Sequence, residues 1–109
     1  MIRVYKGTEL KLSVSIDGAN VNGNHVPMSD YDFDVELYVN GSKPVKRNKS
    51  ECIKQDDDHY IVLLDTNELT KTGRLILKCT AYLPDEDFED DIRTEVSCVD
   101  TDVMIINQM

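Results

Sequence analysis

The residues with the widest chemical range are two histidines and three cysteines. His25 lies in a loop rich in Gly and Asn, and His59 directly follows three aspartates. The cysteines, Cys52, Cys79 and Cys98, all lie in alternating, strand-like runs, where a free thiol usually packs as a small apolar group. Nucleophilic catalysis needs an accessible thiolate with a base in reach. This distribution therefore predicts that the protein is not an enzyme.

Acidic residues gather in two turns, the triplet at 56–58 and the segment 85–91. Calcium-binding loops space their carboxylates at alternate positions, with a Gly and a distal Glu, and neither turn has that spacing. The Gly-Asn loop is not followed by the Lys-Ser/Thr pair of a phosphate-binding loop. These patterns favour solvated turns over a metal site. We predict no cofactor and no small-molecule substrate.

The charge balance restricts the class of partner. The chain has 21 acidic and 12 basic residues, a net charge of −9. Phosphate backbones and anionic membranes attract clustered Lys and Arg, so we expect neither nucleic acid nor a membrane as partner. The sequence shows no apolar run of signal-peptide or membrane-span length. We therefore expect a cytosolic product whose cysteines are reduced.

Two segments are candidates for binding a protein partner. The acidic segment places six acids around one aromatic residue, and aromatic anchors within polar rings are common at interfaces. The second candidate is an apolar run near the C-terminus, which could add to the sheet edge of a neighbour. The alternatives are that the aromatic ring folds back onto the domain and that the apolar run caps the core. The candidate residues are Asp85, Glu86, Asp87, Phe88, Glu89, Asp90 and Asp91, together with Met104, Ile105 and Ile106.

The elements that would position these residues are strands. Apolar residues alternate with polar ones in the segments 10–16, 31–39 and 73–83, and period two indicates a strand with one buried face. No segment shows a sustained period of 3.6. Turn residues recur every 8–12 positions, which is typical of a sandwich. We predict an all-β fold, a single antiparallel β-sandwich domain over residues 1–109, Ig-like in architecture, with six to eight strands.

The longest alternating stretch predicts a central hairpin. Its strands would be Gly73–Leu83 and Ile92–Thr101, joined by the acidic loop Pro84–Asp91. If Leu83 pairs with Ile92, both hairpin cysteines face the core. Residues Val103–Ile106 would form a separate last strand or tail.

Several short stretches resemble small virion proteins of tailed phages, most of all those of crAss-like phages. They are MIRVYKGT (1–8), MSDYDF (28–33), DDHYIV (57–62) and TAYLPD running on to RTE (80–95). The hairpin is also similar to the β-sandwich N-terminal domain of upper-baseplate proteins. The resemblance spans most of the chain and carries no catalytic residues.

The resemblance implies a non-enzymatic virion structural protein, made in the host cytoplasm and bound to other virion proteins. The first expectation is an auxiliary, or decoration, protein on the capsid shell, with the major capsid protein as partner. One alternative is a tail or baseplate subunit that contacts tail proteins. Two further alternatives are a glycan- or host-surface-binding module and an acidic inhibitor that mimics DNA.

Overall fold

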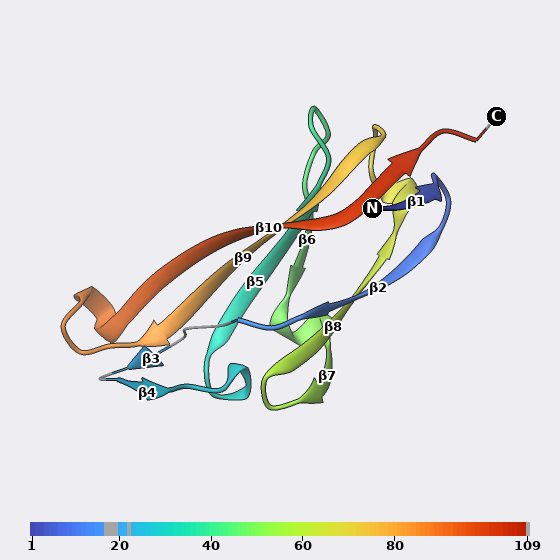
Figure 1. Cartoon of the computed structure of the whole chain (residues 1–109). Coiled ribbons are helices and arrows are strands. Elements are labelled where there is room, and N and C mark those ends of the chain that lie inside the picture. Colours follow the sequence, from blue (N-terminus) through green and yellow to red (C-terminus); the bar gives the residue numbers. More distant parts are fainter. Residues whose placement is uncertain (17–19, 22, 109) are drawn as a thin grey trace.

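The computed structural model describes residues 1–16, 20–21 and 23–108, and the predicted all-β class is confirmed (Figure 1). Two sheets pack face to face, and together they hold eight strands. The larger sheet contains, in spatial order, β1 (Ile2–Tyr5), β10 (Ile92–Ile106), β9 (Gly73–Pro84), β5 (Asp32–Tyr38) and β6 (Val45–Asn48). The smaller contains β2 (Glu9–Val14), β8 (His59–Asp65) and β7 (Ile53–Asp56). The immunoglobulin-like detail stays a prediction.

Short elements connect the strands. A two-residue ladder pairs β3 (Asn20–Val21) with β4 (Asn24–His25). Four 3-10 turns follow along the chain: η1 (Met28–Asp30), η2 (Lys49–Glu51), η3 (Thr66–Glu68) and η4 (Glu89–Asp91). Asp65 caps the turn η3: its carboxylate accepts the N–H of Asn67 at 2.9 Å, as is typical of an acid that precedes a turn.

The hydrophobic core lies between the two main sheets. Every second side chain of β5 and β9 points inward, because alternate side chains of a strand face opposite sides. Phe33 from the larger sheet and Tyr60 from the smaller meet edge to face, with ring centroids 5.1 Å apart. The inward residues of β9 are all buried: Leu75, Leu77, Cys79, Ala81 and Leu83.

Two polar contacts join the sheets at their margins. Lys49 donates to the carbonyls of Ser29 and Tyr31, at 3.0 and 2.7 Å, and its ammonium group lies over the ring of Tyr60. Arg47 of β6 donates to both carboxylate oxygens of Glu68, which follows β8. These contacts tie the β6 margin of the larger sheet to the smaller one.

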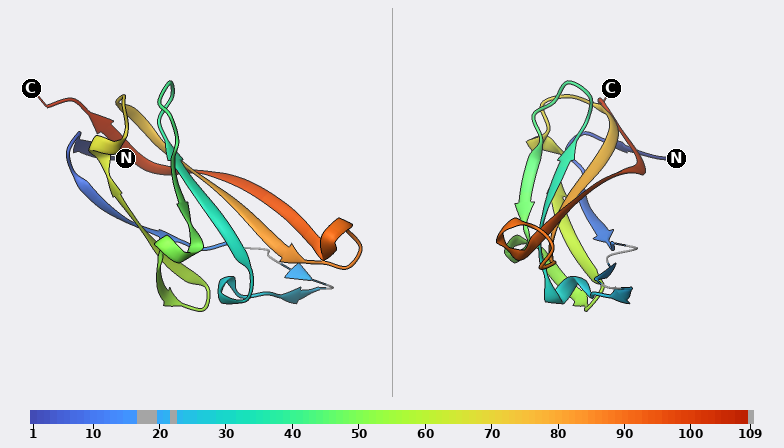
Figure 2. Two further views of the ribbon diagram at one scale, coloured as in Figure 1. Left: turned by 180° about the vertical axis from the view of Figure 1, so that it is seen from behind. Right: turned by 90° about the vertical axis from the view of Figure 1, so that its left-hand side faces the viewer.

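The molecule is elongated, with extents of 53 × 27 × 23 Å. The hairpin formed by β9 and β10 extends along the long axis, and its tip lies at the end opposite the C-terminus (Figures 1 and 2). The small ladder of β3 and β4 lies beside this tip in both figures. The hairpin is therefore the element that positions the candidate site.

Candidate functional site

The acidic tip of the β9–β10 hairpin is closed by its own hydrogen bonds. The N–H of Asp85 donates to the carbonyl of Asp91 at 2.9 Å, and the N–H of Asp91 donates to the carbonyl of Phe88 at 3.1 Å. The carboxylate of Asp85 accepts the N–H of Asp87 at 3.1 Å and the Nε of Arg93 at 3.2 Å. Asp85 therefore acts as the internal brace of the tip.

Two of the tip acids adopt backbone conformations that the turn requires. Asp90 and Asp91 both have φ of 57°, in the left-handed region that Asp adopts more readily than most residues. Their presence is thus explained by turn geometry. The acids that remain for a partner are Glu86, Asp87 and Glu89, all exposed.

Phe88 stands at the tip between these acids. Its side chain is 50% exposed, so the ring does not fold into the core. An aromatic ring that keeps half of its surface in water among carboxylates is an available apolar contact point. The tip thus combines a fixed backbone, exposed negative charge and one exposed aromatic ring.

The C-terminal candidates Met104, Ile105 and Ile106 do not form a free edge. They belong to β10, which runs without a break from Ile92. This stretch lies between β1, which pairs with it in parallel, and β9. Ile105 is fully buried. The sheet-edge interpretation of these residues is therefore wrong. Met104 and Ile105 are paired on both sides, Ile106 is paired with Tyr5 of β1, and Ile105 lies in the core.

The predicted register of the hairpin is also wrong by one residue. Leu83 lies opposite Arg93, and Ile92 lies opposite Pro84. A slip of one residue moves every side chain of a strand to the other face. Cys98 consequently points away from the core and is exposed, with its Sγ 3.9 Å from the hydroxyl of Tyr38.

The first part of β10 forms an edge of the larger sheet, which the alternation pattern did not reveal. Because β1 pairs with β10 only from Val103 onward, no described strand lies beside residues 94–100 on the side away from β9. We call this segment, Thr94–Asp100, the open edge. Its two valines, Val96 and Val99, are 58% and 55% exposed. The only sequence signal for this edge is that Val96 and Val99, on opposite faces of the strand, are both apolar.

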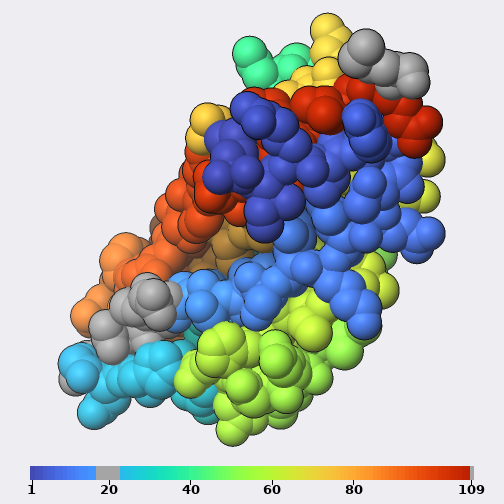
Figure 3. Space-filling view, turned by 45° about the vertical axis from the view of Figure 1, so that its right-hand side comes forward, coloured from blue at the N-terminus to red at the C-terminus, as the bar shows by residue number. Residues whose placement is uncertain are grey.

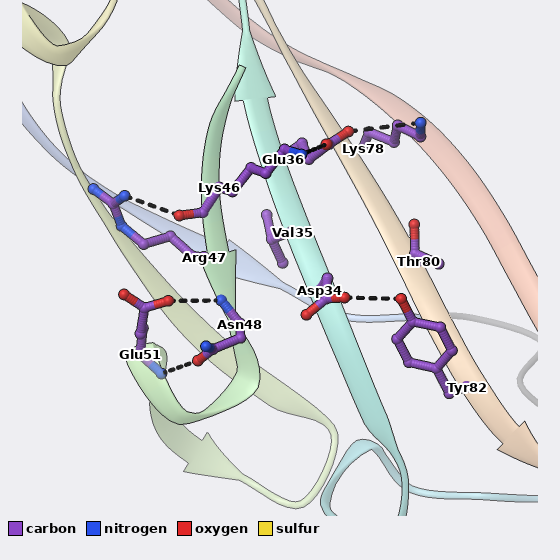
Figure 4. A pocket seen from close by; sticks show the side chains of 10 residues that line it. All are labelled: Asp34, Val35, Glu36, Lys46, Arg47, Asn48, Glu51, Lys78, Thr80 and Tyr82. Atoms are coloured by element: carbon purple, nitrogen blue, oxygen red, sulfur yellow. Dashed lines mark hydrogen bonds and ion pairs between the residues drawn. The ribbon is translucent and has the colours of Figure 1, made fainter. Parts of the chain in front are cut away.

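A polar hollow of about 440 Å³ lies on the outer face of the larger sheet, over β5, β6 and β9 (Figure 4). Its charges are largely satisfied within the chain. Glu36 lies 3.6 Å from the ammonium groups of both Lys46 and Lys78, and the hydroxyl of Tyr82 donates to Asp34 at 2.8 Å. Tyr82 is half-buried at the margin of the hollow.

The hydrogen bonds of the two histidines go to aspartates. Each histidine contacts an aspartate: His25 lies 2.9 Å from Asp58, and His59 lies 2.8 Å from Asp56. Among the described residues no hydrogen bond joins a histidine to a cysteine. Burial raises the pKa of the Cys79 thiol to about 12, which keeps it protonated at neutral pH.

Within the described residues, no group of three or more His, Cys, Asp or Glu side chains stands where it could hold a metal ion. No described helix is long and apolar enough to cross a membrane. Comparison with protein-family models, with curated proteins and with solved structures finds no match for this chain.

Proposed function

We propose that this chain is a non-enzymatic structural subunit that docks onto a larger assembly through the tip of its β9–β10 hairpin. The observation that carries the proposal is a tip fixed by internal hydrogen bonds that presents Glu86 and Asp87 beside the half-exposed ring of Phe88. A fixed backbone reduces the entropy that binding must overcome, and the carboxylates favour a basic partner surface.

The assembly we propose is a phage virion, and this step rests on the sequence resemblance. The chain would be an auxiliary protein bound to the major capsid protein, and the alternative within the same class is a tail or baseplate subunit. A small subunit with a charged docking tip at one end suits attachment to a shell in many copies.

The test is incorporation into particles. Wild-type chain, a Glu86→Lys/Asp87→Lys variant and a Glu9→Lys/Asp30→Lys control would be supplied in infected cells, and purified particles would be quantified by mass spectrometry. Each substitution changes the charge by two units, so both double variants move the net charge from −9 to −5. Asp85 stays intact, because it braces the tip.

We expect wild type and control in purified particles at a fixed stoichiometry, and at least a roughly tenfold lower occupancy of the tip variant, which corresponds to about 1.4 kcal/mol of docking free energy. Wild-type chain that is abundant in the lysate but absent from particles would reject the virion assignment. Equal incorporation of tip variant and control would instead reject the tip as the docking site. Separated heads and tails would distinguish decoration from a tail role.

The second candidate is a glycan- or host-surface-binding module, favoured by the polar hollow of Figure 4. Sugars are held by planar aromatic rings flanked by polar groups. The hollow has such a lining, with the ring of Tyr82 and the polar side chains of Thr80 and Asn48. A glycan array probed with wild type and Tyr82→Ala would test it. Binding that Tyr82→Ala abolishes would favour this candidate, and an array without signal would reject it.

A further inference from the structure

The open edge lacks a neighbour that the rest of β10 has. Residues 103–106 of β10 are covered by β1, whereas residues 94–100 pair only with β9 among the described strands. In a strand, the N–H and C=O groups of alternate residues point to each side, so this stretch directs hydrogen-bonding groups outward. Such an edge is a template for one more strand.

The core behind the open edge is also incomplete. A hollow of about 410 Å³ lies between β10 and β2, with apolar lining from Leu12, Val14, Leu77 and Val99. In Figure 3 it appears as a recess between the orange-red β10 and the blue β2. A strand added to the open edge would close this recess and cover Val96 and Val99. Covering exposed apolar surface contributes roughly 25 cal/mol per Å².

We propose that the strand added here comes from a second copy of this chain, antiparallel to the first and centred on Val96. When a strand pairs antiparallel with its own copy, residues that lie opposite each other must be on the same face of the sheet. Because alternate residues face opposite sides, the two residue numbers must then have an even sum, and the two-fold axis passes through a residue. With Val96 at the centre, residue 92 lies opposite residue 100. Pairing then uses the regular part of β10 and stops before the irregularity between Asp100 and Met104.

Three other registers fit less well. A centre at Ser97 would place Arg93 opposite Thr101, inside the irregularity between Asp100 and Met104. A centre at Cys98 would place Ile92 opposite Met104, where Arg3 of β1 already pairs. A centre at Glu95 would place two like charges directly opposite, which is destabilising. With Val96 at the centre, Glu95 lies opposite Ser97 and no like charges meet.

Charge repulsion between the copies is limited by the antiparallel arrangement. Each acidic tip begins at Asp91, five residues from the two-fold axis, and a strand rises about 3.4 Å per residue, so the tips lie roughly 34 Å apart. This separation exceeds the screening length of about 8 Å at physiological salt. The net charge of −9 therefore permits the pairing once the tips point in opposite directions.

The first test measures the mass of the purified chain by sedimentation equilibrium. We expect a dimer for wild type and at least a tenfold higher dissociation constant for Val96→Lys, which places two ammonium groups at the axis. Ile53→Lys is the matched control, since Ile53 is similarly exposed, at 49%, but lies on β7 at the edge of the other sheet. Circular dichroism would verify that both variants are folded.

The second test reads the register by disulfide trapping. In a Cys52→Ser/Cys98→Ser background, Val96→Cys should give a covalent dimer under mild oxidation, because opposite Cβ atoms in antiparallel strands lie about 4.5–5.5 Å apart. Ile53→Cys in that background should form no covalent dimer. Trapping through native Cys98 should be slower, because Cys98 would lie opposite Thr94.

Each other outcome overturns the inference. A wild-type chain that stays monomeric at about 1 mM has a self-affinity weaker than roughly −4 kcal/mol, which would leave the open edge to a strand of another protein. A dimer that survives Val96→Lys, or that Ile53→Lys disrupts, would place the interface elsewhere. Faster trapping at Cys98 than at position 96 would overturn the Val96-centred pairing. The inference concerns the isolated chain, so it stands or fails independently of docking to a virion.

Discussion

The hydroxyl of Thr66 holds together the corner where β1, β2 and η3 meet, and its removal should be measurable. Thr66 is fully buried. Its Oγ1 accepts the N–H of Gly7 at 2.8 Å and donates to the carbonyl of Thr8, also at 2.8 Å. Thr66→Val keeps the size of the side chain and deletes both contacts, so the change tests the hydrogen bonds and not the packing.

The loss is unequal for the two partners. The carbonyl of Thr8 still accepts the backbone N–H of Thr66 at 3.1 Å, whereas the N–H of Gly7 loses its acceptor. A buried donor left unpaired costs about 1–3 kcal/mol. Gly7 itself is exposed, so water can reach part of the group, and we expect the lower half of that range, about 1.5 kcal/mol.

Urea unfolding followed by circular dichroism would measure this free energy. With an m-value near 1.5 kcal/mol per M, typical of a small domain, the midpoint should fall by about 1 M. Thr70→Val is the control, because Thr70 is exposed and its hydroxyl makes only a 3.3 Å contact with Ser42. Amide exchange at Gly7 should accelerate in Thr66→Val alone. A midpoint within about 0.2 M of wild type, with Gly7 still protected, would refute this account of the corner.

The remaining predictions concern thiols, pH and the core. A thiol reagent at pH 8 should modify exposed Cys98 about a thousandfold faster than Cys79, whose pKa of about 12 leaves little thiolate; similar rates in the native protein would contradict its burial. The hydrogen bond from Arg74 lowers the pKa of the Asp100 carboxyl, so its contribution to stability is present above pH 4 and lost as pH falls through the folded pKa. Asp100→Asn should therefore flatten the acid side of the stability profile, and an unchanged profile would reject that linkage. Leu77→Asp should unfold the domain, since an unpaired buried charge costs several kcal/mol; a native circular dichroism spectrum would show that Leu77 does not face the core.

Local patterns were enough to predict much of the fold. The alternation in residues 31–39 correctly assigned Phe33 and Val35 to the core, because a strand with one buried face must repeat every two residues. The basic strand β6 lies at an edge of the larger sheet, where Lys and Arg side chains oppose pairing with a further strand. Asp65 caps η3, and such a cap can be read from local sequence because it depends on neighbours within three residues.

The candidate site required more than these patterns. The acidic tip was visible as a run of carboxylates, but the structure separates Asp85 as a brace and Asp90 and Asp91 as turn formers from the acids left for a partner. The sequence around Thr66 gives no local sign of its contact with Gly7, 59 positions away.

The alternation of β10 was determined by the sequence, whereas its register and its exposed side were settled only in the folded chain. A period of two residues indicates that Val96 and Cys98 share a face of the strand. The same period fits a shared face turned to the core and one turned to solvent. Pairing of Leu83 with Arg93 turned that face outward, and the short reach of β1 left Thr94–Asp100 uncovered. Both outcomes depend on contacts between segments distant in the chain, where a shift of one residue preserves every local preference and reverses which side chains are buried.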